Sequence, residues 1–346
     1  MDGDLKSLAE QARDQAKRVR LVQDQVPLAA GRLLHQYVEG NDFGSATSHA
    51  SSPEAQNVDI LSLLRLLRNL CASGQASADQ LHLCGTATYT ARLLSTQPRA
   101  QIQGDNTLCL LAVQLLANLA ATGRQGQADV WEAAYPAALE NSLQACNVHP
   151  LSRILERCCS SSQECAAQLC GSSGAHLLSF VVEQSTISPH MDEMGDLIVQ
   201  LVVVHGQLEA VMAACDSCAD SQASRLHVLR LLSQEISQIG DRKDPDSLPG
   251  HLDQSVHHLA AGMQQNLPQC TAGSPAADAL QASLEVLQAV FARDDGGAGL
   301  LQDCSAVSAL KYAVSTASCA KSGAFAGGSR AAFGTVPGRC GQPFVT

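Results

Sequence analysis

Two segments of the chain carry its clearest pattern of apolar and polar positions, Asn57–Gly74 and Asn106–Gly123. In each segment apolar residues recur every three or four positions, which is the spacing of one helix face. Further leucines widen that apolar face, so each helix can be removed from water only if other elements pack against it on more than one side. The pattern therefore predicts two helices buried between neighbouring elements. The apolar positions are Ile60, Leu63, Leu64, Leu67 and Cys71 in the first segment and Leu108, Leu111, Ala112, Leu115 and Leu119 in the second.

The two segments also repeat each other. When Asn69 is placed on Asn118, an offset of 49 residues, the surrounding leucines coincide and Gly74 coincides with Gly123. Armadillo and HEAT repeats have periods of roughly 40–47 residues, and this helix end with its glycine resembles the last helix of an armadillo repeat. We therefore predict an all-α fold, an armadillo/HEAT-like right-handed solenoid in which each helical repeat packs mainly on its neighbours.

Further helices are predicted on either side of the second segment. Ser77 and Gln80 have the spacing of a capping box, which predicts a helix that continues through Leu94. Val130-Trp131 opens an apolar pattern that predicts another helix to about Leu143. No segment shows the period-2 alternation, bounded by hairpin turns, of a half-buried strand.

The same patterns give the expected domain organisation. We expect one α-solenoid over residues 1–321, with its clearest repeats at 53–145. Residues 239–250, rich in aspartate and proline, are expected to form a loop. Residues 322–346 change to glycine, serine and alanine without periodicity, which predicts a disordered tail.

Composition and charge narrow the class of protein. The chain has 346 residues, of which 45% are hydrophobic and only 3% aromatic, so a large helical core is expected. The net charge of −11 comes from dispersed acidic residues, and lysines and arginines do not gather in a patch. Because nucleic-acid binding needs clustered cations, we expect no nucleic-acid partner.

Targeting and membrane signals are missing from the sequence. The N-terminus is charged from its second residue and has no apolar core of a signal peptide. The longest aliphatic stretch, Leu197–Val204, is far too short to span a bilayer. We expect a cytoplasmic (cytosolic) protein that does not bind a membrane.

Three motifs in a fixed order resemble the ataxin-10 family. They are Leu66–Ala72 (LLRNLCA), Leu115–Ala121 (LLANLAA) and Val130–Pro136 (VWEAAYP). The resemblance extends from about residue 58 to 143 and is faint from there to 317; residues 322–346 do not resemble the closing helical block of the family. It implies a cytosolic armadillo-like protein without enzyme activity or cofactor, linked to cytokinesis and cell survival through protein partners.

Asn69 and Asn118 are the leading candidates for contact with such partners. In armadillo proteins of the importin and catenin type, the asparagine at this place holds the backbone of an extended peptide on the concave face. An amide suits this role because it both donates and accepts hydrogen bonds. Alternatively, each asparagine bonds a neighbouring backbone group and fixes the stacking of repeats. Arg65 and Gln114, one turn earlier, would flank the same surface or lie in solvent.

The fourteen cysteines are expected to be reduced, and most of them to pack as small apolar residues. Cys215 and Cys218 form a C-x-x-C pair, a weak candidate for copper or zinc because a structural zinc site needs four ligands. A cysteine-based metal-handling protein is therefore the alternative to the scaffold. Trp131 is expected to pack between repeats. No catalytic motif is present, and we expect no enzyme activity.

Overall fold

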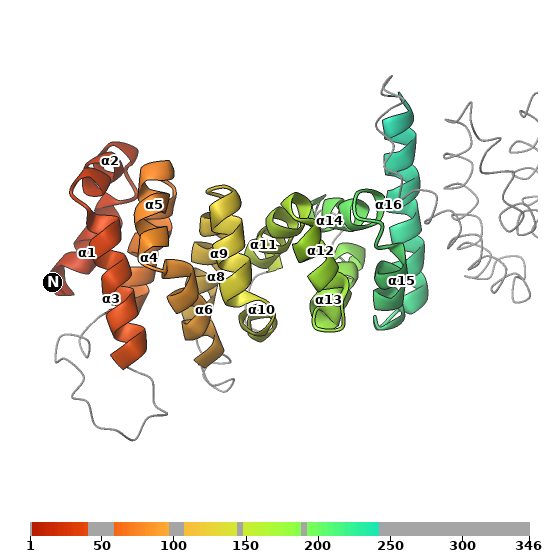
Figure 1. Ribbon diagram of the computed structural model, residues 1–346, viewed down its shortest axis with the longest axis horizontal. Helices are drawn as coiled ribbons and strands as arrows, with labels where there is room; N and C mark the ends of the chain where they lie inside the picture. Colours follow the sequence, from red (N-terminus) through yellow and green to blue (C-terminus); the bar gives the residue numbers. More distant parts are fainter. Residues whose placement is uncertain (1, 41–58, 97–106, 144–147, 188–191, 242–346) are drawn as a thin grey trace, which may run out of the picture. The chain divides into compact units, whose positions relative to one another are not determined.

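The computed structural model describes residues 2–40, 59–96, 107–143, 148–187 and 192–241, where the chain forms fifteen α-helices and no strand (Figure 1). The all-α prediction is confirmed for these residues. The helices are α1 (Asp2–Gln11), α2 (Gln15–Gln23), α3 (Val26–Gly40), α4 (Ile60–Cys71), α5 (Gln75–Leu83), α6 (Thr86–Thr96), α8 (Thr107–Ala120), α9 (Arg124–Ala134), α10 (Ala137–Ser142), α11 (Val148–Ser161), α12 (Gln163–Cys170), α13 (Ala175–Ile187), α14 (Asp192–Val203), α15 (Leu208–Asp216) and α16 (Ser221–Asp241).

These helices fall into two compact units, one ending at Leu197 and the other beginning at Ile198, within α14. In the second unit α15 packs on α16. The Arg225 guanidinium donates to both carboxylate oxygens of Asp216, each at 2.6 Å, and so ties the start of α16 to the end of α15.

The helices of the first unit contact one another in rows. One row is formed by α1, α4, α8 and α11, each in contact with the next, and a second by α3, α6, α10 and α13. Figure 1 shows α3 and α6 side by side. A third row joins α5 to α9, and Trp131 Nε1 on α9 donates to Gln168 Oε1 on α12 at 2.7 Å. Because each helix of a row contacts the next helix of that row, the all-α architecture is repeat-like.

The two segments predicted as buried helices are α4 and α8, which pack against each other in the first row. Their predicted apolar faces form much of the core. Asp59 opens α4 by accepting hydrogen bonds from the backbone and the hydroxyl of Ser62, at 3.2 and 2.6 Å. Fully buried residues of the two helices include Leu63, Leu64, Leu67, Leu70, Leu115, Leu116 and Leu119.

The helix predicted from the Ser77 capping box is wrong in two ways. α5 already begins at Gln75, and Ser77 is buried inside it instead of capping its start. The helix then breaks at Gly85, whose positive φ of 61° suits glycine and ends α5, and α6 starts afresh at Thr86. Gly74 and Gly123 likewise have positive φ, but they stand at the start of α5 and α9 instead of closing α4 and α8.

The helix predicted from Val130 to Leu143 is also two helices. α9 starts earlier, at Arg124, and α10 begins only after Pro136, which lacks the N–H that a continuous helix needs. Trp131 lies within α9 and is only 6% exposed, which confirms that it packs between helices. Tyr135 stacks on it at 4.4 Å between ring centroids.

The predictions for the C-terminal part of the chain can be compared with the structure only up to residue 241. The predicted loop at 239–250 starts too early, because α16 continues to Asp241. The rest of that loop and the predicted tail at 322–346 lie outside the described residues, so a single solenoid over 1–321 stays a prediction.

Taken singly, none of the described helices has the length and apolar character to cross a membrane. α12 and α13 would meet that criterion only together, and they are bent by 92° relative to each other.

Candidate functional site

Asn69 lies half-buried in the last turn of α4 and reaches across to α1. Its Nδ2 donates to the Ala9 carbonyl oxygen at 3.2 Å. The last four carbonyls of a helix have no partner inside it. In α1, backbone N–H groups of the following turn reach the other three of these carbonyls. Asn69 therefore supplies a donor that the end of α1 lacks.

Asn118 makes the same contact one helix further along the row. Its Nδ2, on α8, donates to the Arg68 carbonyl oxygen in the last turn of α4 at 3.1 Å. Both asparagines thus hold a terminal carbonyl of the preceding helix. This geometry fits the alternative that they fix the stacking of repeats; contact with a partner peptide stays a prediction.

Arg68 connects these contacts and was missed by the sequence analysis. Its Nη1 donates to Gln114 Oε1 on α8 at 2.7 Å. Its Nε and Nη2 donate to Asn69 Oδ1 at 3.3 and 3.1 Å. Burial lowers the pKa of Arg68, and the nearby charges of Arg13 and Arg65 add to the effect. The repeat gave no signal for this pair, because the offset of 49 residues aligns Gln114 with Arg65 and not with Arg68.

We call Arg65, Arg68, Asn69, Gln114 and Asn118 the polar row. All five side chains are half-buried, with the leucine core of α4 and α8 behind them. Part of their hydrogen-bonding capacity is unused within the described residues. The guanidinium of Arg65, Nε2 of Gln114 and Oδ1 of Asn118 form no hydrogen bond there. The row therefore still presents both donors and acceptors to an incoming group.

Asn118→Ala is expected to lower the free energy of unfolding by about 1 kcal/mol, because it removes a hydrogen bond and leaves the Arg68 carbonyl to be hydrated. The measurement is urea denaturation of the full chain. Gln125→Ala is the matched control: this exposed amide donates to Asp129 one turn along the same helix, and its loss should cost only about 0.2–0.5 kcal/mol. Equal effects of the two changes would contradict a stacking role for Asn118.

Carboxyl groups crowd together where α11 meets the start of α14. Burial raises the pKa of Glu156, and the charges of Asp196 and Glu193 raise it further, while Arg157 partly offsets them. Burial also raises the pKa of Asp196, followed by the charges of Asp192 and Glu193. Glu193 in turn lies 3.5 Å from both His149 Nδ1 and Arg153 Nε. This end of the first row is thus acidic and carries unfavourable like-charge contacts.

Glu156→Gln is expected to stabilise the first unit at neutral pH, by about 0.2–1 kcal/mol because this half-buried group is still partly screened by solvent. A raised pKa means that the folded chain holds the proton to higher pH than the unfolded chain does. The contribution of Glu156 is therefore favourable below the unfolded pKa and is lost as pH rises through the folded pKa. The gain in the variant should vanish below about pH 4. Denaturation curves from pH 3 to pH 8 measure it, and a gain that persists in acid would indicate packing instead of charge.

Cys215 and Cys218 offer little to a metal ion. Cys215 is fully buried at the end of α15, and burial raises the pKa of its thiol to about 12, far from the thiolate that metals bind. The Cys218 thiol donates to the Ala214 carbonyl at 3.3 Å. Across the described ranges, no three histidine, cysteine or acidic residues are grouped to hold a metal. None of the nine cysteines in these ranges is joined to another of them by a disulfide.

His82, Asp129 and Thr122 have the residue types of a catalytic acid, histidine and hydroxyl group. His82 on α5 places Nδ1 2.7 Å from Asp129 Oδ2 and Nε2 3.3 Å from the Thr122 hydroxyl. However, the Thr122 hydroxyl donates to the Leu119 carbonyl at 2.7 Å. The hydroxyl proton therefore points away from the imidazole, which cannot act as its base in this arrangement. His82 instead ties α5 to Asp129 on α9 and to Thr122 in the turn between α8 and α9.

Comparison with known proteins leaves the family open. No protein-family model matches the chain, and no curated protein matches it. Among solved structures, the chain is similar to an engineered protein from the Northeast Structural Genomics Consortium, with 12% identity and a TM-score of 0.37, over 95% of this chain and 93% of that one. A likeness at this TM-score carries no argument about fold or function.

Proposed function

We propose that this protein is a non-catalytic scaffold that binds partner proteins along the polar row. The observation that carries the proposal is the hydrogen-bonding capacity left over once the helices are joined. Arg65, Gln114 and Asn118 keep donors and acceptors that no other described residue uses. These groups lie on two consecutive helices of one row, so they recur along the surface and not at a single point.

An extended protein segment is the partner that suits such a surface. Its backbone presents N–H and C=O groups in alternation, and each must find a partner when it leaves water. Amide side chains can meet both needs, and the Arg65 guanidinium adds donors for carbonyl or carboxylate oxygens. The buried leucines of α4 and α8 provide a firm base, so the partner need not enter a deep pocket.

The arrangement of the helices as a repeat solenoid is part of the same proposal. We infer an armadillo/HEAT-like right-handed solenoid, supported by the rows in which corresponding helices meet. Membership of the ataxin-10 family, a cytosolic location, and roles in cytokinesis and cell survival rest on the sequence motifs that resemble that family. The proposal includes no cofactor, because the family resemblance implies none, and no nucleic acid, because lysines and arginines do not cluster in the sequence. It includes no membrane, because the longest aliphatic stretch is too short to span one. The metal-handling alternative gains no support from the described cysteines.

The test compares the proteins that co-purify with the wild-type chain and with a variant altered only at the polar-row groups that make no hydrogen bond among the described residues. In Arg65→Gln/Gln114→Glu the glutamate keeps the oxygen that accepts from Arg68, so the stacking contact survives while the spare amide donor of Gln114 and the positive charge of Arg65 are lost. The matched control, Arg92→Gln/Gln125→Glu, makes the same chemical changes on α6 and α9, away from the row. Both variants are first shown to unfold at the same temperature as the wild type.

We expect partners that co-purify with the wild-type chain and with the control to be lost from the row variant. The same set of partners on all three proteins would refute binding along the polar row and leave its residues as parts of the architecture.

A further inference from the structure

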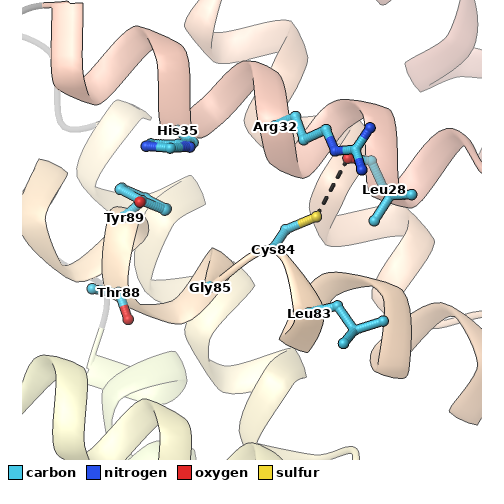
Figure 2. Close-up of a pocket in the computed structure, with 8 residues that line it drawn as sticks. All are labelled: Leu28, Arg32, His35, Leu83, Cys84, Gly85, Thr88 and Tyr89. Atoms are coloured by element: carbon cyan, nitrogen blue, oxygen red, sulfur yellow. Dashed lines mark hydrogen bonds between the residues drawn. The ribbon is translucent and has the colours of Figure 1, made fainter.

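An open cavity of about 670 Å³ lies between α3 and the junction of α5 with α6 (Figure 2). Helix α3 contributes three side chains at i, i+4 and i+7, which share one helix face. The junction contributes the remaining five residues. The lining consists of Leu28, Arg32 and His35 from α3 and Leu83, Cys84, Gly85, Thr88 and Tyr89 from the junction.

The walls of this cavity are held in place by close packing beside it. At Gly31, α3 approaches the junction so closely that a Cβ atom would lie 2.7 Å from Cys84 Cβ. The Cys84 thiol donates to the Leu28 carbonyl at 3.4 Å, the contact drawn in Figure 2. On the other side His35 stacks on Tyr89, with ring centroids 4.3 Å apart. The cavity is therefore pre-formed between two anchored walls.

The charge of the lining is opposite to that of the chain as a whole. The chain carries a net charge of −11, yet none of the eight lining residues is acidic and two are basic. Arg32 forms no hydrogen bond or ion pair with any described residue. Glu39, one turn beyond His35, is already paired with Arg92 at 2.6 Å. Burial raises the pKa of the Cys84 thiol, which therefore stays neutral and adds no negative charge at pH 7.

The remaining wall is apolar and open to solvent. Leu83 is 82% exposed, the largest exposed fraction among the large hydrophobic side chains of the described residues. It faces the same cavity as Leu28. Covering these side chains would remove apolar surface from water, which is favourable.

We propose that this cavity binds a small organic anion. Its carboxylate, sulfonate or phosphate would lie at Arg32 and His35, and its apolar body would cover Leu28 and Leu83. The volume is in the range of pockets that hold small molecules, about 300–1,000 Å³. This site goes beyond the proposed scaffold function and shares no residue with the polar row, so either proposal can fail without the other.

The test uses two probes of nearly the same size and shape, the charged 2-naphthoate and the neutral 2-naphthamide, titrated calorimetrically into the full chain. We expect saturable 1:1 binding of the acid and clearly weaker binding of the amide. Arg32→Gln should weaken naphthoate binding roughly 10- to 100-fold, as for a lost hydrogen bond to a charged group. Arg92→Gln, a cation already paired outside the cavity, is the matched control and should leave the affinity unchanged.

A second variant tests the apolar wall without endangering the fold. Leu83→Ser changes a side chain that lies mostly in solvent, and it should weaken the binding of both probes. The proposal is overturned if the wild type does not bind naphthoate at millimolar concentration, if acid and amide bind alike, or if Arg32→Gln and Arg92→Gln bind equally well.

Discussion

Replacing Leu116 by alanine is expected to lower the free energy of unfolding by about 2–5 kcal/mol, the usual cost of emptying a leucine site in a core. Leu116 is fully buried in α8, between the helices that precede and follow it in the first row. Helix α8 packs against α4, α6, α9 and α11, so collapse of the cavity left by the substitution would require several helices to move. Urea denaturation followed by circular dichroism measures the change.

Leu83→Ala is the matched control for that experiment. It makes the same substitution at a side chain that is 82% exposed, and its effect should stay within about 0.5 kcal/mol. If the two variants were equally stable, α8 would not lie at the centre of the core, and the stacking of α4 on α8 would be wrong.

Gly126→Ala is the second change with a large expected effect. A Cβ atom there would lie well inside van der Waals contact with the Leu119 carbonyl oxygen and the Thr122 hydroxyl. The closest atom belongs to the backbone of the fully buried Leu119 in the last turn of α8, so the backbones of α8 and α9 would have to separate. Overpacking of this kind costs about 1–3 kcal/mol or more, which exceeds the gain of up to about 1 kcal/mol from replacing glycine in a helix.

We therefore expect a net loss of about 1–2 kcal/mol in a thermal or urea unfolding experiment. Ala128→Gly, at an exposed position of the same helix, calibrates the helix propensity of α9 by itself. A variant Gly126→Ala that is more stable than the wild type by that same propensity would show that α9 does not approach α8 as closely as described.

The helices α4 and α8 could be predicted because their apolar residues follow the helical period without interruption. The breaks at Gly85 and Pro136 were missed because the prediction followed the apolar pattern, which continues on both sides of each break and does not mark where one helix ends and the next begins. Gly85 turns the chain through its positive φ, while Pro136 removes one backbone donor. Both effects are local, and they divided two predicted helices into four.

The candidate site was predictable only in part. The repeat pointed to Asn69 and Asn118, but their acceptors depend on which carbonyl each preceding helix leaves without a backbone donor. That depends on the geometry of helix ends, which a sequence pattern does not record. Arg68 was missed for a related reason. It bonds Gln114 across the stack, and the repeat aligns Gln114 with Arg65 and not with Arg68.

The most direct test of the scaffold proposal is photo-crosslinking from the polar row itself. A benzophenone amino acid in place of Arg65 puts the reactive group on α4 without removing any hydrogen bond among the described residues. The same amino acid in place of Arg92 on α6 is the control. We predict defined adducts with protein partners from position 65, competed away by the unmodified chain, and none from position 92. No adduct from position 65, or the same adducts from both positions, would contradict binding along the polar row.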